Sequence, residues 1–77
     1  MEKGDVVFLC DVVPKCNMYE IIELIIRTVG DDYAVGVDDK TKQAHLFKYD
    51  MFDKYVFATR ADAVEALKVL RAENEND

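Results

Sequence analysis

The sequence predicts a mostly β fold of the α+β class: a five-stranded antiparallel SH3-like small barrel or bent sheet with one C-terminal helix. β-branched and aromatic residues gather in short runs, and polar turns separate these runs. A threonine cap then precedes a stretch of helix formers. The 77 residues leave room for a single domain. We expect residues 4–58 to form the β body, residues 60–72 the helix and residues 73–77 a frayed acidic tail.

The first strand is predicted over residues 6–13, which are rich in strand-forming types and follow a turn signal at Gly4 and Asp5. Pro14 ends this strand because proline has no backbone N–H to donate to the ladder. Residues 14–17 are therefore expected to form a turn or loop.

The segment from Tyr19 to Val29 is compatible with two structures. A helix is supported by Asn17 as a possible cap and by Glu20 at the capping-box position. A strand is favoured because the segment is dense in β-branched side chains, which are stiff at χ1. We predict a strand, in which alternation places Ile22, Leu24, Ile26 and Thr28 on one face and Ile21, Glu23, Ile25 and Arg27 on the other. The helix remains the alternative.

Three further strands are predicted over residues 33–37, 43–49 and 55–58, separated by polar turns. Gly36 interrupts the first of them and is a candidate bulge, which small barrels need where the sheet bends. In the second, Ala44, Leu46 and Lys48 lie opposite His45, Phe47 and Tyr49. Residues 50–54 are expected to form a short loop or a single helical turn.

Thr59 is the clearest local signal, because its hydroxyl can accept from the free N–H groups of the first helical turn. Asp62 follows at the third helical position, where the helix dipole favours negative charge. The apolar stripe predicted for this helix comprises Ala63, Val64, Leu67 and Leu70.

The charge balance argues against a nucleic-acid or membrane binder. Ten Lys and Arg face sixteen Asp and Glu, for a formal charge of −6, and such a field repels phosphates and anionic lipid. Lysines 40, 42, 48 and 54 could still form a local basic spot. The apolar fraction of 51% is high for so short a chain, so part of it is expected at a partner or subunit interface, and a homodimer is possible.

Two cysteines and the lack of an N-terminal leader pattern point to the cytoplasm, where thiols stay reduced. Cys10, Cys16 and His45 fall short of a zinc site, because structural zinc uses paired ligands at closer spacing. The chain has no serine and one histidine, and no nucleophile–base signature is present. We therefore expect a non-enzymatic protein with no catalytic, metal or cofactor site.

Aromatic and acidic side chains cluster around the loop before the last strand. Tyr49, Phe52 and Tyr55 are candidates for an exposed contact patch, ringed by Asp50 and Asp53. The carboxylate pairs at turns are explained by turn chemistry, but adjacent turns could add to an acidic binding face. The predicted partner-binding residues are Tyr49, Asp50, Phe52, Asp53, Tyr55, Asp31, Asp32, Asp38 and Asp39.

Residues 4–8 (Gly-Asp-Val-Val-Phe), 22–26 (Ile-Glu-Leu-Ile-Ile) and 56–63 (Val-Phe-Ala-Thr-Arg-Ala-Asp-Ala) resemble small accessory proteins of phages and prophages of Firmicutes. In those proteins a β-rich body ends in a Val-Phe-x-Thr-Arg strand-to-helix junction. The chain departs from them in its two cysteines and in residues 50–53, where they are richer in Glu and Gly. The resemblance implies an accessory that binds a host protein, because some small acidic phage proteins inhibit host defence systems, including CRISPR effectors.

Two other functions fit the same composition. An acidic nucleic-acid mimic would fill the basic channel of a target protein, and its affinity would fall steeply with salt. An oligomeric module would hold a small ligand, such as a nucleotide signal, at a subunit interface.

Overall fold

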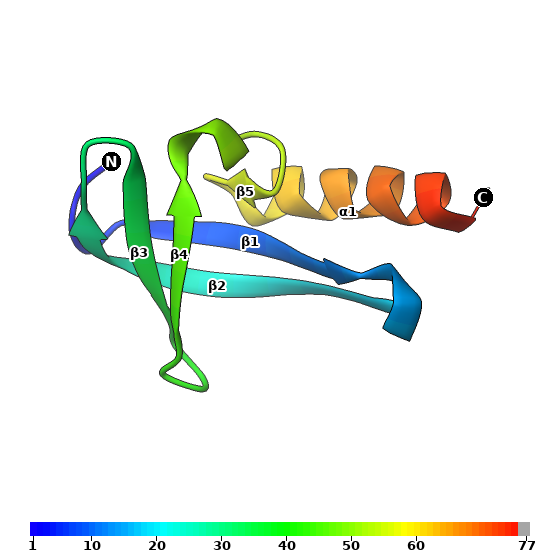
Figure 1. Cartoon of the computed structure of the whole chain (residues 1–77), viewed down its shortest axis with the longest axis horizontal. Coiled ribbons are helices and arrows are strands. Elements are labelled where there is room, and N and C mark those ends of the chain that lie inside the picture. The colour runs from blue at the N-terminus through cyan, green and yellow to red at the C-terminus, as the bar shows by residue number, and fades with distance from the viewer. Residues whose placement is uncertain (76–77) are drawn as a thin grey trace.

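The computed structural model of the protein describes residues 1–75 and confirms the predicted class. Five antiparallel strands form one sheet that curls into a half-barrel, and a single helix follows (Figure 1). The elements are β1 (Val6–Val13), β2 (Met18–Val29), β3 (Tyr33–Asp38), β4 (Ala44–Lys48), β5 (Val56–Phe57) and α1 (Arg60–Glu75). The strand order is β4-β3-β2-β1-β5, so β4 and β5 are the two edges.

The ambiguous segment is a strand, as predicted: β2 pairs with β1 along the whole of β1 and with β3 on its other side. A 3₁₀ turn over Pro14–Cys16 connects β1 and β2, and Asn17 closes it in the left-handed conformation with φ 51°. Asparagine tolerates this region better than most residues because its short side chain can bond locally.

One predicted face assignment in β2 is wrong. The ladder between β2 and β3 shifts register between Ile26 and Thr28, so that Ile26 faces Gly36 but Thr28 faces Val35. The extra residue, Arg27, lies on β2, whereas the sequence pointed to a bulge at Gly36 itself. A bulge inverts the alternation beyond it, and Thr28 therefore lies on the face opposite Leu24.

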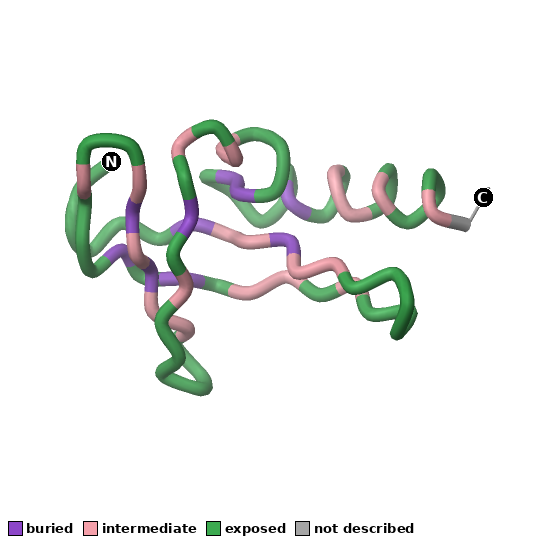
Figure 2. The backbone as a smooth tube through the Cα atoms, in the orientation of Figure 1, coloured by how far each residue is buried: buried purple, intermediate pink, exposed green. Residues whose placement is uncertain are grey.

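The sheet buries side chains on both of its faces, and Figure 2 shows the buried positions where the strands cross and where the helix begins. The strand core fills the concave face and comprises Val7, Leu24, Ile26, Ala34, Phe47 and Val56. The helix core lies on the opposite face, between β1, β5 and α1, and comprises Cys10, Phe57 and Ala63. The long β1–β2 hairpin thus serves two cores at different points along its length.

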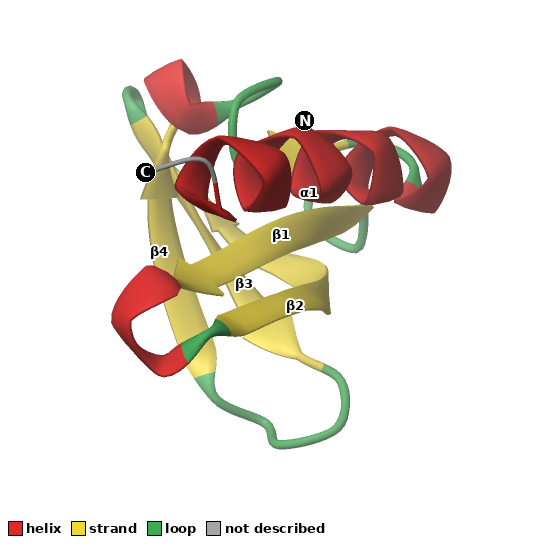
Figure 3. Cartoon of the chain, turned by 90° about the vertical axis from the view of Figure 1, so that its right-hand side faces the viewer, coloured by secondary structure: helices red, strands yellow, loops and turns green. Residues whose placement is uncertain are grey.

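The helix begins as predicted, because the Asp62 N–H donates to Thr59 Oγ1 at 3.2 Å. It lies along β1, β2 and β5 (Figure 3). The predicted stripe is wrong at Val64, which is exposed, while Ala66 packs against the helix core with Leu67 and Leu70.

The helix ends later than expected. It continues to Glu75, so residues 73–75 of the predicted tail belong to it, and Asn76 and Asp77 lie outside the described residues. No helix within residues 1–75 has the length and apolarity needed to cross a membrane.

Candidate functional site: an acidic–aromatic end

The sheet topology brings two polar loops together at one end of the molecule. Successive turns of an antiparallel meander lie at alternating ends, so the β2–β3 turn meets the chain that leaves β4. The Tyr49 N–H donates to the Asp32 carbonyl oxygen at 3.1 Å, and the Tyr49 hydroxyl donates to the Gly30 carbonyl oxygen at 2.7 Å. These two hydrogen bonds tie the acidic turn to the first residue of the 3₁₀ turn over Tyr49–Met51.

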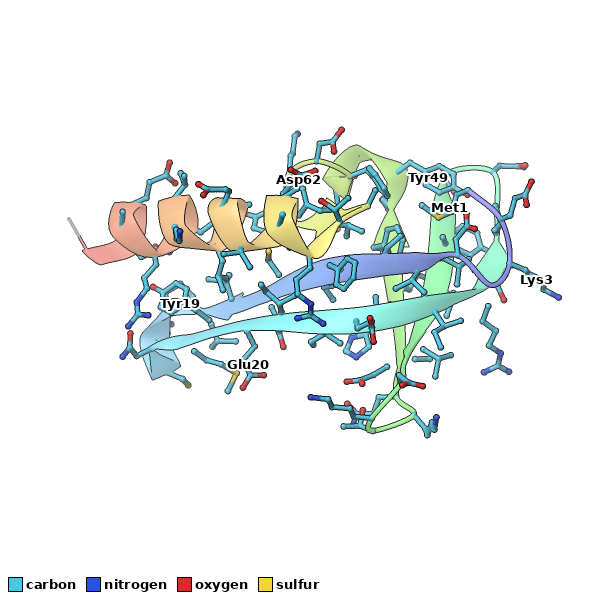
Figure 4. The ribbon with its side chains drawn as sticks, turned by 180° about the vertical axis from the view of Figure 1, so that it is seen from behind. Met1, Lys3, Tyr19, Glu20, Tyr49 and Asp62 are labelled. Atoms are coloured by element: carbon cyan, nitrogen blue, oxygen red, sulfur yellow. The ribbon has the colours of Figure 1, made fainter. Side chains whose placement is uncertain are left out.

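A shallow apolar hollow of about 440 Å³ lies beside this junction. It is lined by Met1, Val29, Tyr49 and Phe52, and Figure 4 shows Met1 and Tyr49 side by side. Tyr49 and Phe52 are half-buried and pack against the strand core. The floor of the hollow is therefore continuous with the folded interior.

Three exposed carboxylates accompany the hollow. Asp31 and Asp32 belong to the turn that Tyr49 contacts, and Asp50 follows Tyr49 directly. We call the hollow and these carboxylates the acidic–aromatic end. An apolar floor with anionic neighbours suits a partner that presents an apolar side chain flanked by Lys or Arg.

The other four predicted site residues lie away from the acidic–aromatic end. Asp38 and Asp39 lie at the opposite end of the β3–β4 hairpin. Asp53 lines a groove beside α1. Tyr55 is exposed next to β1, where its carbonyl oxygen accepts from the Cys10 N–H at 2.7 Å. Of the nine predicted residues, five therefore meet at the acidic–aromatic end: Tyr49, Asp50, Phe52, Asp31 and Asp32.

The hollow also contains two residues that the sequence did not single out, Met1 and Val29. Val29 turns toward the hollow because the bulge at Arg27 inverts the alternation of β2. Strict alternation would have placed Val29 on the face of Ile25. The meeting of the β2–β3 turn with Tyr49 did have a sequence signal, namely the alternation of turns along a predicted meander.

Asp38 plays a structural part in the β3–β4 turn. Its carboxylate accepts from the backbone N–H of Lys40 at 2.8 Å and from that of Thr41 at 3.4 Å. The Lys40 hydrogen bond lowers the pKa of the Asp38 carboxyl, and the Thr41 N–H adds to that effect. This is the Asx-turn chemistry expected of aspartate in such turns.

Cys10 and His45, two of the three residues weighed as zinc ligands, lie on opposite faces of the sheet. Cys10 faces Ile21 in the ladder and points into the helix core, whereas His45 shares its face with Ile26. Side chains five residues apart on β2 lie on opposite faces, which separates the two groups. Within residues 1–75, the structure brings no three His, Cys, Asp or Glu residues into a group that could hold a metal ion.

The two thiols are expected to differ sharply in reactivity. Cys10 is buried and its Sγ donates to the Ala63 carbonyl oxygen at 3.4 Å, while Cys16 is exposed. Burial raises the pKa of the Cys10 thiol, which lowers its thiolate fraction. Iodoacetamide should therefore modify one site in the folded protein and both in denaturant, as read by mass spectrometry. A Cys16→Ser variant should stay unmodified until it is unfolded, and rapid native labelling of that variant would contradict the buried position of Cys10.

Comparisons of the chain with protein-family models, with curated proteins and with solved structures give no match.

Proposed function

We propose that this protein is a non-catalytic binding protein that docks a partner protein on its acidic–aromatic end. The observation that carries the proposal is the apolar hollow, held in shape by the two Tyr49 hydrogen bonds and accompanied by three exposed carboxylates. A binding surface that is already ordered in the free protein loses less conformational entropy when the partner binds. Carboxylates at the rim speed encounter with a basic partner and select against acidic ones.

The resemblance to phage and prophage accessory proteins suggests the kind of partner. A bacterial host protein with a basic surface, such as a defence protein, matches both that resemblance and the net charge of −6. On this proposal the protein acts in the cytoplasm, and it inhibits or modulates its target by occupying a surface. Direct nucleic-acid binding is not part of the proposal, because the same charge repels phosphates.

The test compares two triple variants that remove equal charge. Asp31→Asn, Asp32→Asn and Asp50→Asn neutralise the acidic–aromatic end, while Asp11→Asn, Glu20→Gln and Glu23→Gln neutralise carboxylates on the β1–β2 hairpin. Wild type and both triples serve as bait for bacterial lysate, and captured proteins are identified by mass spectrometry. The captured partner is then purified and titrated against each bait.

The first triple should weaken binding by about tenfold or more, and the second by less than about threefold. Equal losses in both triples, together with a steep loss of affinity as salt rises, would instead indicate a nucleic-acid mimic whose whole surface carries the charge pattern. A thermal shift with nucleotides and no captured protein would indicate the small-ligand module. No protein enriched over an unrelated acidic bait would contradict the proposal.

A further inference from the structure

A second apolar surface lies on the outer face of the sheet, opposite the strand core. Cross-strand partners build it, in two adjoining rows: Val6, Ile25, Val37 and Ala44 in one, and Val35 and Leu46 in the other. We call these six residues the outer sheet patch. Leu46 is 64% exposed, Val6 43% and Ile25 39%. Within residues 1–75 the helix packs on a different part of this face, around Cys10 on the β1–β2 hairpin.

On β3 the larger apolar side chains face outward, toward the patch, and the smaller residues face inward. Ala34 and Gly36 face the strand core, whereas the bulkier Val35 and Val37 face outward. Outward-facing positions of a sheet that meets only water usually carry polar side chains. Contiguous exposed apolar residues with polar neighbours mark interaction surfaces.

The surroundings of the patch are basic, although the protein as a whole is acidic. Lys3, Arg27 and Lys42 line a hollow of about 390 Å³ over Ile25 and Val37, and Lys48 follows Leu46 on the same face. Two carboxylates stand against these four cations: Glu23, which precedes Ile25 on the same face of β2, and Asp39, which lines the hollow and contacts Lys42 at 3.5 Å. That ion pair is exposed and therefore weak. The cations disfavour stacking of two such patches on each other and favour a partner with an acidic rim.

A groove with the opposite charge lies along the helix. Its apolar floor is formed by Phe57, Ala66, Val69 and Leu70, and its rim carries the four carboxylates of Asp53, Asp62, Glu65 and Glu73 together with the cation Lys54. The groove has a volume of about 430 Å³, and Val69 is 55% exposed. We call it the helix groove. The acidic rim of the helix groove is complementary in charge to the basic surroundings of the outer sheet patch.

We propose that the outer sheet patch of one molecule docks in the helix groove of a second copy of the same chain. The hollow of the patch and the groove share no lining residue, and Lys3 and Asp62, one from each, lie apart in Figure 4, so the two surfaces meet only between molecules. Such a contact is heterologous and joins molecules head to tail. The acidic–aromatic end takes no part in this contact, so the self-association proposal can be tested independently of the proposed function.

Sedimentation velocity over a range of concentrations tests the contact through two single substitutions. Leu46→Glu places a carboxylate in the patch, and Val69→Lys places an ammonium in the groove. Each should weaken self-association by about tenfold or more. Val13→Glu and Val64→Lys make the same changes at exposed apolar positions outside both surfaces and should leave it unchanged. All four positions are exposed, and circular dichroism confirms that each variant folds before it is compared.

Mixing the two interface variants gives the sharper result. The Leu46→Glu protein keeps an intact groove and the Val69→Lys protein an intact patch, so the mixture should form a complex that neither variant forms alone. A symmetric dimer would give no such complementation and would overturn the proposal. A wild-type protein that stays monomeric up to about 1 mM would also overturn it, because that concentration corresponds to only about 4 kcal/mol of binding free energy.

Discussion

Replacing Phe47 with alanine is expected to lower the free energy of unfolding by about 3–5 kcal/mol. Phe47 is 2% exposed in the strand core, where it belongs to the same cluster as Leu24 and Val56. The loss combines the transfer free energy of the ring with the cavity left behind. A 77-residue domain has a total stability of only about 4–12 kcal/mol at ordinary values per residue. Urea unfolding followed by circular dichroism should therefore show a midpoint at a much lower urea concentration than in wild type, because the variant loses a large fraction of the total stability.

The matched control is Leu46→Ala, one residue earlier on the same strand. Leu46 faces outward and is 64% exposed, so at low micromolar concentration its truncation should change stability by less than about 0.5 kcal/mol. The pair tests which face of β4 is buried, because a shift of one residue would exchange the two roles. Similar losses in both variants would contradict the register of β4 on β3.

Local chemistry was enough to predict several elements. The density of β-branched side chains in β2 favoured a strand, and the pairing with β1 and β3 confirms it. Thr59 predicted the start of α1, because its hydroxyl accepts from the Asp62 N–H in the first helical turn. The register shift beside Arg27 could not be predicted in this way. It depends on how far the sheet must curl to close over the strand core, which is a property of all five strands rather than of residues 26–28.

The candidate site was predictable in its parts and only partly in its assembly. The acidic turns and the aromatic loop could each be identified from composition, but which of them meet depends on the ends at which antiparallel turns lie. That rule would have joined Asp31 and Asp32 to Tyr49 and separated them from Asp38. Val29 could not have been placed at the hollow without knowledge of the bulge. The outer sheet patch and the helix groove could not be predicted from the sequence either, because each combines residues from several elements.

The second large effect is expected at Gly36, where β3 approaches Leu24 more closely than any side chain allows. A Cβ atom added at Gly36 would lie 2.7 Å from Leu24 Cβ and 3.1 Å from its Cδ1. Leu24 Cβ is attached directly to the backbone, so a rotamer change cannot relieve the contact and the strands themselves must move apart. We expect Gly36→Ala to lower the free energy of unfolding by about 1–3 kcal/mol and Gly36→Val to lower it further.

The sign of the change in stability on Gly36→Ala shows whether glycine is required at this position by close packing. In a relaxed strand, Gly→Ala stabilises by about 0.4–1 kcal/mol because it restricts the unfolded chain. At Gly36 the clash must exceed that gain, and the ladder hydrogen bonds of β3 should also exchange faster with solvent. Chemical denaturation measures the first and amide hydrogen exchange the second. A Gly36→Ala protein at least as stable as wild type would contradict this close approach. It would show that Leu24 leaves room for a methyl group above β3 and that the strand core is less tightly packed than described above.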